Sequence, residues 1–232
     1  MLRRAVNQST ADDPLGGWKA WQKHLAQRCN PEPPPFFKGN ELPLLWGWPQ
    51  AWQRDEIHTM LATRKRQRAS NLENAATQFL PTTDGGETPD LPTALQLVAL
   101  AYALPKLSKH TSAEHWWQLV EKLHDLASEA QQHRVDWPAE PQDVVRQQLL
   151  AGELPLALSY LFPEVRALRS LGKAARSALT EGLIELTDGQ GLPHARLLPV
   201  LGPLFACWTR ARWLGARLKN GSWSGNAELQ YE

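Results

Sequence analysis

The sequence predicts an all-α protein, and three observations carry this prediction. Apolar residues recur at spacings of three and four along several long segments, which is the period of one face of an α-helix. Proline and glycine separate these segments and mark where one helix ends and the next begins. No segment alternates polar and apolar residues for long enough to predict a β-strand.

The chain is expected to form one domain. Its 232 residues can bury one substantial core. Residues 1–15 predict a loose tail, and residues 16–232 predict a single helical domain. From Asn226 the sequence has the features of a helix cap and first turn, so we expect the chain to be the N-terminal part of a longer protein.

Helices in the first half of this domain are expected over residues 17–28, 50–68, 70–80 and 93–104. The first of these has Trp18, Trp21 and Leu25 on one face and charged residues on the other. The helix over 93–104, which we expect Thr93 to cap, is apolar on most sides and is therefore expected to be buried. It should stop before Pro105, because proline lacks the N–H that a helix interior needs.

Helices in the second half are expected over residues 111–133, 142–151, 155–162, 163–187 and 199–219. Thr111 and Glu114 predict a capping box, Gly152 is expected to end a helix, and Pro163 is expected to begin one. The last helix should bury a stripe formed by Val200, Leu204, Cys207, Trp208, Ala211 and Leu214. Sequential helices of this kind pack as antiparallel pairs in bundles, solenoids or α/α toroids. No period of about 30 to 50 residues is present, which argues against a regular repeat array.

Composition excludes several classes of protein. The formal net charge of +1 provides no overall field for nucleic acid or an acidic membrane, so we expect neither as a partner. No apolar run reaches the ~18 residues of a membrane helix, and the basic N-terminus lacks the apolar stretch of a secretory signal. The default expectation is therefore the cytoplasm.

Cysteine and tryptophan content allow two readings each. Cys29 and Cys207 fit neither a disulfide framework nor a zinc site, so we expect two reduced thiols, with one disulfide between them as the alternative. The chain has 11 tryptophans, whose large flat rings suit core packing or the C–H face of a sugar ring. We favour core packing for each of them. No phosphate loop, nucleophile elbow or HExxH motif is present, and we expect no cofactor and no metal.

One loop gathers the polar residues that are candidates for a site. The segment GLIELTDGQGLPHARLLPVLGPLF passes from one helix to the next through an Asp-Gly turn and carries Asp188, His194 and Arg196. A carboxylate, an imidazole and a guanidinium together could bind or act on a charged substrate. The structural alternative is that Asp188 caps the turn while His194 and Arg196 lie on the surface.

The same segment resembles the N-terminal helical domain of heparinase II/III-like proteins. The likeness covers about residues 150–218 and is carried by Leu179, Leu183, Leu186, Asp188, Gly189, Arg196, Leu197, Leu198, Leu201, Leu204 and Arg210. It implies part of an α/α toroid, with a β-sandwich region beyond Glu232. It also implies a polysaccharide lyase that cleaves uronate-containing polymers by β-elimination, often outside the cytoplasm.

Two functions remain open from the sequence. In the first, the chain is the toroid of such a lyase, His194 and Arg196 are catalytic, and Asp188, Trp208 and Trp213 bind the acidic polysaccharide. In the second, it is a non-catalytic helical scaffold or a module that binds a glycan or a protein. We favour the first and keep the second as the alternative. Pro193 and Leu198 stand near the positions where the lyases tend to carry an acidic residue and a tyrosine, which argues against catalysis by this chain alone.

Overall fold

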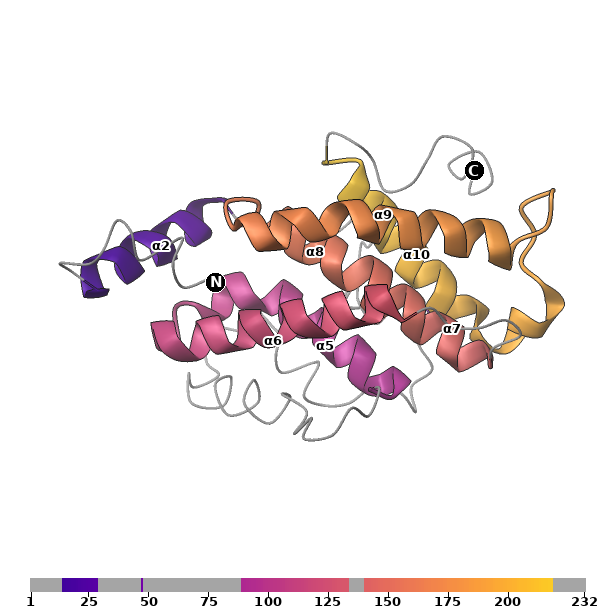
Figure 1. Ribbon diagram of the computed structural model, residues 1–232, viewed down its shortest axis with the longest axis horizontal. Helices are drawn as coiled ribbons and strands as arrows, with labels where there is room; N and C mark the ends of the chain where they lie inside the picture. Colours follow the sequence, from indigo (N-terminus) through magenta and orange to yellow (C-terminus); the bar gives the residue numbers. More distant parts are fainter. Residues whose placement is uncertain (1–13, 29–46, 48–88, 134–139, 219–232) are drawn as a thin grey trace.

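A computed structural model describes residues 14–28, 47, 89–133 and 140–218 of the chain (Figure 1). The regular elements within these ranges are helices, and the isolated β-bridge between Thr187 and Pro193 does not extend into a strand. The prediction of an all-α protein is therefore confirmed, whereas the toroid stays a prediction. The expected helices over 50–68 and 70–80 and the expected turn at Asn226 lie outside the described residues, as does most of the expected tail.

Helix α2 (Pro14–Arg28) begins earlier than expected, so the last two residues of the expected tail are helical. The predicted face is confirmed, because Leu25 is fully buried and both tryptophans are partly buried against the core. The rings of Trp18 and Trp21 lie 5.7 and 6.2 Å from the ring of Trp116. This aromatic contact fixes α2 against α6 (Ala113–Gln132).

The caps of α5 (Leu91–Leu107) and α6 differ from those expected. Asp90, not Thr93, caps α5, because its carboxylate accepts a hydrogen bond from the Thr93 N–H at 2.9 Å. In the same way Ser112 replaces Thr111 as the cap of α6, since the Ser112 hydroxyl accepts from the His115 N–H. The Thr111 hydroxyl instead donates to the carbonyl of Leu107, which closes the turn between the two helices.

α5 also continues through Pro105, where we expected it to stop. Proline removes one backbone hydrogen bond from the last turn of the helix. The helix is buried on most sides, as predicted, and the packing of its apolar residues holds it in place despite that loss. The Pro105 carbonyl is satisfied by the hydroxyl of Ser108 at 2.7 Å.

A continuous helix passes through Gly152, where we expected a break. α7 (Pro141–Gln147) widens into a π-helical turn (Gln148–Glu153) and continues as α8 (Leu154–Leu161). The N–H of Leu154 donates to the carbonyl of Leu149, five residues back. We attribute the wider turn to Pro155, whose ring would clash with the preceding turn of a regular α-helix. Gly152 lets α9 approach closely, since an added Cβ would lie 2.7 Å from Leu179 Cδ2.

α9 (Arg166–Leu186) begins three residues later than expected, because Pro163 lies in a turn and Val165 is the cap. The predicted 3–4 periodicity of its buried face is confirmed from Leu168 to Leu186. A short 3₁₀ helix (Ala195–Val200) then leads into α10 (Leu201–Gly215), whose start we expected at Pro199. The stripe predicted for the last helix is buried at every position.

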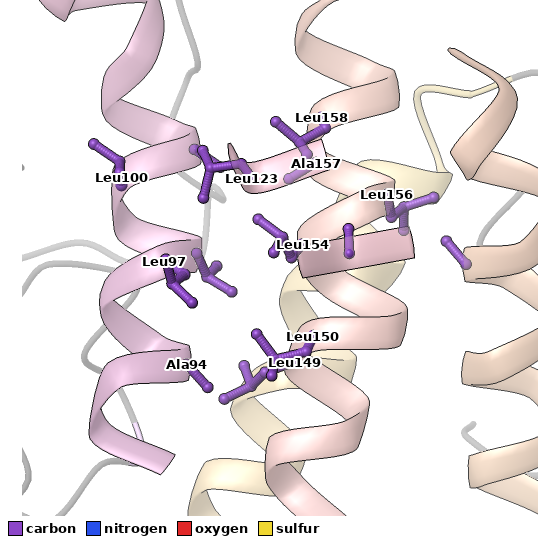
Figure 2. Close-up of a cluster of buried hydrophobic side chains, with 14 of the residues drawn as sticks. Ala94, Leu97, Leu100, Leu123, Leu149, Leu150, Leu154, Leu156, Ala157 and Leu158 are labelled. Atoms are coloured by element: carbon purple, nitrogen blue, oxygen red, sulfur yellow. The ribbon is translucent and has the colours of Figure 1, made fainter. Parts of the chain in front are cut away.

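The core is centred on α8, against which α5, α6, α9 and α10 all pack. Leucines and alanines of α5 face those of the π turn and α8, with Leu123 of α6 beside them (Figure 2). The described tryptophans are also buried or partly buried, as predicted, and Trp116 donates from its ring N–H to the carbonyl of Leu104. This core encloses the polar groups of the π turn.

Candidate functional site

Asp188 organises the turn that we expected it to cap. Its Oδ1 accepts hydrogen bonds from the backbone N–H groups of Gln190 and Leu192, both at 2.9 Å. Gly191 adopts a φ of 77°, a conformation that glycine reaches without steric cost. One oxygen of the carboxylate is thus used in the loop, although the residue itself is exposed.

His194 and Arg196 are exposed in the same loop. The His194 N–H donates to the carbonyl of Leu186, and its ring Nε2 donates to the carbonyl of Glu185 at 3.1 Å. The imidazole is therefore tied to the end of α9. Arg196 lies at the start of the 3₁₀ helix, and Leu197 beside it is fully buried and anchors the loop. The loop thus brings the two residues assigned as catalytic to one exposed corner.

Trp208 and Trp213 belong to the interior instead of to this corner. Trp208 has no exposed surface, and its ring N–H donates to Gln148 Oε1 at 3.1 Å. Trp213 is 8% exposed, and the guanidinium of Arg217 lies 3.9 Å above the centre of its ring. Neither ring therefore offers an open face to a sugar.

The π turn carries a buried ion pair that sequence reasoning did not find. Glu153 is fully buried, and its two carboxylate oxygens accept from Nε and Nη2 of Arg210 at 2.7 and 2.9 Å. The Tyr102 hydroxyl lies 3.4 Å from the same carboxylate. At the other end of the turn, the Gln148 amide donates to the carbonyl of Ala178 and accepts from the ring of Trp208. The turn therefore links α5, α9 and α10 through polar contacts.

Burial controls the protonation of the groups around this pair. Burial raises the pKa of Tyr102 well above its usual value, and the negative charge of Glu153 adds to the effect. The pKa of the Cys207 thiol is raised for the same two reasons, in the same order. Burial opposes the charge of Arg210, but the carboxylate of Glu153 outweighs it and the pKa of the guanidinium rises. Tyrosine and thiol are thus held neutral beside a charged pair that is closed to solvent.

Cys207 is a free, buried thiol, as we expected. A neutral, inaccessible thiol is a poor nucleophile. Cys29 lies outside the described residues. Within the described parts of the chain, no cluster of His, Cys, Asp or Glu could hold a metal ion.

A second feature missed in the sequence is a row of cations along α9. We call Arg166, Arg169, Lys173 and Arg176 the basic face of α9. Their spacing of three, four and three residues places them within an arc of about 80° and along about 15 Å of helix. The first three are exposed and Arg176 is half-buried, and no acidic residue occurs between Arg166 and Thr180.

The basic face is unfavourable for the helix itself. Cations three or four residues apart repel one another. Those in the first turns also oppose the helix dipole, which favours negative charge at an N-terminus, and α9 has no acidic residue in its first turn. The spacing of the four basic residues could have identified this face from sequence alone.

The chain was compared with models of protein families, with curated proteins and with solved structures, and none of them matched. Among the described helices, none is both long and apolar enough to cross a membrane. Function must therefore be inferred from the corner, the buried pair and the basic face themselves.

Proposed function

We propose that this protein is a non-catalytic helical module that binds an acidic polysaccharide through the basic face of α9. The observation that carries the proposal is the row Arg166, Arg169, Lys173 and Arg176, which is set on one side of a helix without an intervening acid. α9 runs along the outside of the helical body for its whole length (Figure 1). An extended polymer could follow such a row.

Carboxylates fit this surface chemically. The planar fork of an arginine guanidinium matches the two oxygens of a carboxylate, and three of the four cations are arginines. A uronate chain carries its carboxylates at regular intervals, so several can be bound at once. Because each contact is exposed and weak, affinity would come from the number of contacts made.

Nucleic acid fits the basic face less well. Proteins that bind single strands combine cations with aromatic rings on which bases stack. The exposed positions interspersed with these cations are Ser170, Ala174 and Ser177, which offer no ring. The nearly neutral chain also lacks the overall positive charge typical of nucleic-acid-binding domains.

Catalysis is left out of the proposal because of how the ionisable groups are used. Glu153, Arg210 and Cys207 are buried, and Tyr102 beside them is partly buried. His194 donates from Nε2 to the carbonyl of Glu185 in the last turn of α9, and Asp188 organises its own turn. β-Elimination needs a base that removes the proton at C5 of the uronate and an acid that protonates the leaving oxygen.

The test measures binding of the full chain to polygalacturonate, with neutral dextran and single- and double-stranded DNA as competitors. We compare the wild type with Arg166→Gln/Arg169→Gln/Lys173→Gln. The matched control, Lys19→Gln/Lys23→Gln/Lys109→Gln, removes the same charge from exposed positions elsewhere. We expect the first triple variant to bind polygalacturonate about tenfold or more weakly, the control to bind within about twofold, and salt to weaken binding throughout.

Three results would contradict the proposal. They are no binding of polygalacturonate at low salt, equal loss in both triple variants, or tighter binding of DNA. The ultraviolet absorbance of the same mixtures also measures turnover, since β-elimination creates a product that absorbs in the ultraviolet. Turnover that His194→Ala/Arg196→Ala abolishes would establish the lyase function in place of the binding module.

A further inference from the structure

Tyr160 is the accessible residue of an otherwise buried helix. Every other residue of α8 is buried, whereas Tyr160 is partly exposed. Its ring packs edge to face against Trp213 of α10, with the ring centres 6.2 Å apart. Exposed Arg217 packs on the same tryptophan, with its guanidinium 3.9 Å above the ring centre. We call Tyr160, Trp213 and Arg217 the Tyr160 cluster, in which an accessible ring and an exposed cation are positioned by one buried tryptophan.

The Tyr160 cluster lies next to the basic face of α9. A Cβ added to Gly172 of α9 would lie 2.8 Å from the hydroxyl oxygen of Ser159 and 3.6 Å from Nη1 of Arg176. Ser159 of α8 is therefore close to the last cation of the basic face, and Tyr160 is the next residue along α8. Side chains of successive helical residues point about 100° apart, so Ser159 and Tyr160 reach neighbouring sides of α8. The row of cations is thus followed, across α8, by an aromatic ring and a further cation.

Trp213 also carries a hydrogen-bond donor that the fold does not use. Its ring N–H is buried and has no acceptor among the described residues. Buried polar groups nearly always have a partner, so an unpaired one is a candidate for contact with a bound molecule. Arg217 is a long, exposed side chain whose guanidinium lies over the same ring. If this guanidinium moved onto a ligand, an oxygen of the ligand could reach the N–H.

We propose that the Tyr160 cluster is a subsite for one uronate unit of the bound polysaccharide. The apolar C–H face of the sugar stacks on Tyr160, and its carboxylate binds the guanidinium of Arg217. Aromatic rings with a few well-placed polar groups are a common lining of sites for small ligands. The inference rests on the proposed function, because the neighbouring units of the polymer would lie along the basic face.

One ring beside the row of cations suits a sugar better than a nucleic acid. Proteins that bind single strands stack successive bases on several rings. Trp213 is buried and covered by Arg217, so Tyr160 is the ring of the cluster on which a ligand can stack. The cluster therefore adds selectivity for a sugar ring to a surface that otherwise recognises negative charge.

Two acidic polymers separate stacking from charge. Polygalacturonate carries its carboxylates on sugar rings, whereas poly-L-glutamate carries carboxylates without rings. In the full chain, Tyr160→Leu should weaken binding of polygalacturonate about threefold or more and leave binding of poly-L-glutamate unchanged, because it removes only the stacking ring. Tyr160→Phe is the matched control, since it keeps the ring, and it should bind both polymers within about twofold of the wild type. Circular dichroism checks that each variant is folded.

The cation and the buried donor of the cluster are tested separately. Arg217→Gln should weaken binding of both polymers about threefold or more, because the guanidinium pairs with a carboxylate of either one. Lys109→Gln removes the same charge from an exposed position elsewhere and should change neither affinity by more than about twofold. In the wild type, the nuclear magnetic resonance signal of the Trp213 ring N–H, assigned by its loss in Trp213→Phe, should shift when polygalacturonate is added.

Three results would overturn the subsite. They are a Tyr160→Leu chain that binds polygalacturonate as the wild type does or loses both polymers equally, an Arg217→Gln chain that behaves as Lys109→Gln does, and a Trp213 signal that saturating polygalacturonate does not shift. Each leaves the proposed function standing if the triple variant of the basic face still loses binding. No binding of polygalacturonate by the wild type would overturn both proposals.

Discussion

The ion pair between the π turn and α10 is buried, whereas the basic face of α9 is mostly exposed. Glu153 and Arg210 lie in the interior, where a bidentate pair satisfies both carboxylate oxygens. The basic face of α9 is mostly exposed, and its four cations follow one another along one side of the helix. The first arrangement is closed to ligands, and the second is open along its length.

This difference indicates which charged residues are candidates for a functional role. A buried ion pair with complete hydrogen bonds stabilises one arrangement of helices, and removing either partner leaves a charge without compensation. Exposed cations three or four residues apart repel each other, so the helix gains little from the row as a whole. We therefore expect substitutions in the two regions to change different properties, stability in the interior and binding on α9.

The largest effect is expected from Glu153→Gln. It leaves the guanidinium of Arg210 buried without its counter-charge, and the free energy of unfolding should fall by about 3–5 kcal/mol. Urea unfolding followed by tryptophan fluorescence measures this change. Asp143→Asn breaks the partly exposed pair of Asp143 and Arg146 instead, and should cost less than about 1 kcal/mol.

Replacing both partners separates the cost of an unpaired charge from the value of the pair. Glu153→Leu/Arg210→Met should recover most of the stability lost in Glu153→Gln, because no charge remains buried. If the double variant were as unstable as the single one, the pair would be stabilising in itself.

Gly182→Ala should have the next largest effect. An added Cβ would overlap the amide of Gln148, which holds both the carbonyl of Ala178 and the ring of Trp208. Overpacking and the loss of these hydrogen bonds should cost about 1–3 kcal/mol. Gly189→Ala is the control, since nothing lies within 4 Å of its added Cβ. Equal stabilities of the two variants would show that the π turn is not tightly packed against α9.

The sequence predicted correctly the features that depend on the local spacing of apolar residues. The buried faces of α9 and α10 follow the 3.6-residue repeat, and both agree with the structure. The π turn could not be predicted, because Gly152 and Pro155 usually mark the end of a helix and only burial on all sides keeps this one continuous. Glu153 and Arg210 are 57 residues apart, and nothing in one sequence pairs them. The basic face could have been identified from the spacing of its four basic residues.

Alkaline pH should destabilise the interior and leave α9 unaffected. The folded pKa values of Tyr102 and Cys207 are raised, so both stay protonated in the folded chain and ionise first in the unfolded chain. Their stabilising contribution is complete below the unfolded pKa and is lost as pH rises above about 9 for the thiol and about 10 for the phenol.

The free energy of unfolding measured between pH 8 and 11 tests this expectation. Above each unfolded pKa, stability should fall by up to about 1.4 kcal/mol per pH unit for each group. Cys207→Ala removes the contribution of the thiol, so its decline should begin about one pH unit higher than in the wild type. If both proteins declined from the same pH, the thiol would not be held neutral by the fold.

The smallest change in stability, and the one of opposite sign, is expected for Arg166→Gln. Arg166 is the first residue of α9, where its charge opposes the helix dipole and repels Arg169 one turn later. Removing it should raise the free energy of unfolding by about 0.3–1 kcal/mol at low ionic strength, with no gain at high salt because both effects are screened. A loss of stability at low salt would mean that Arg166 supports the fold, and the basic face would then belong with the interior pair as a structural feature.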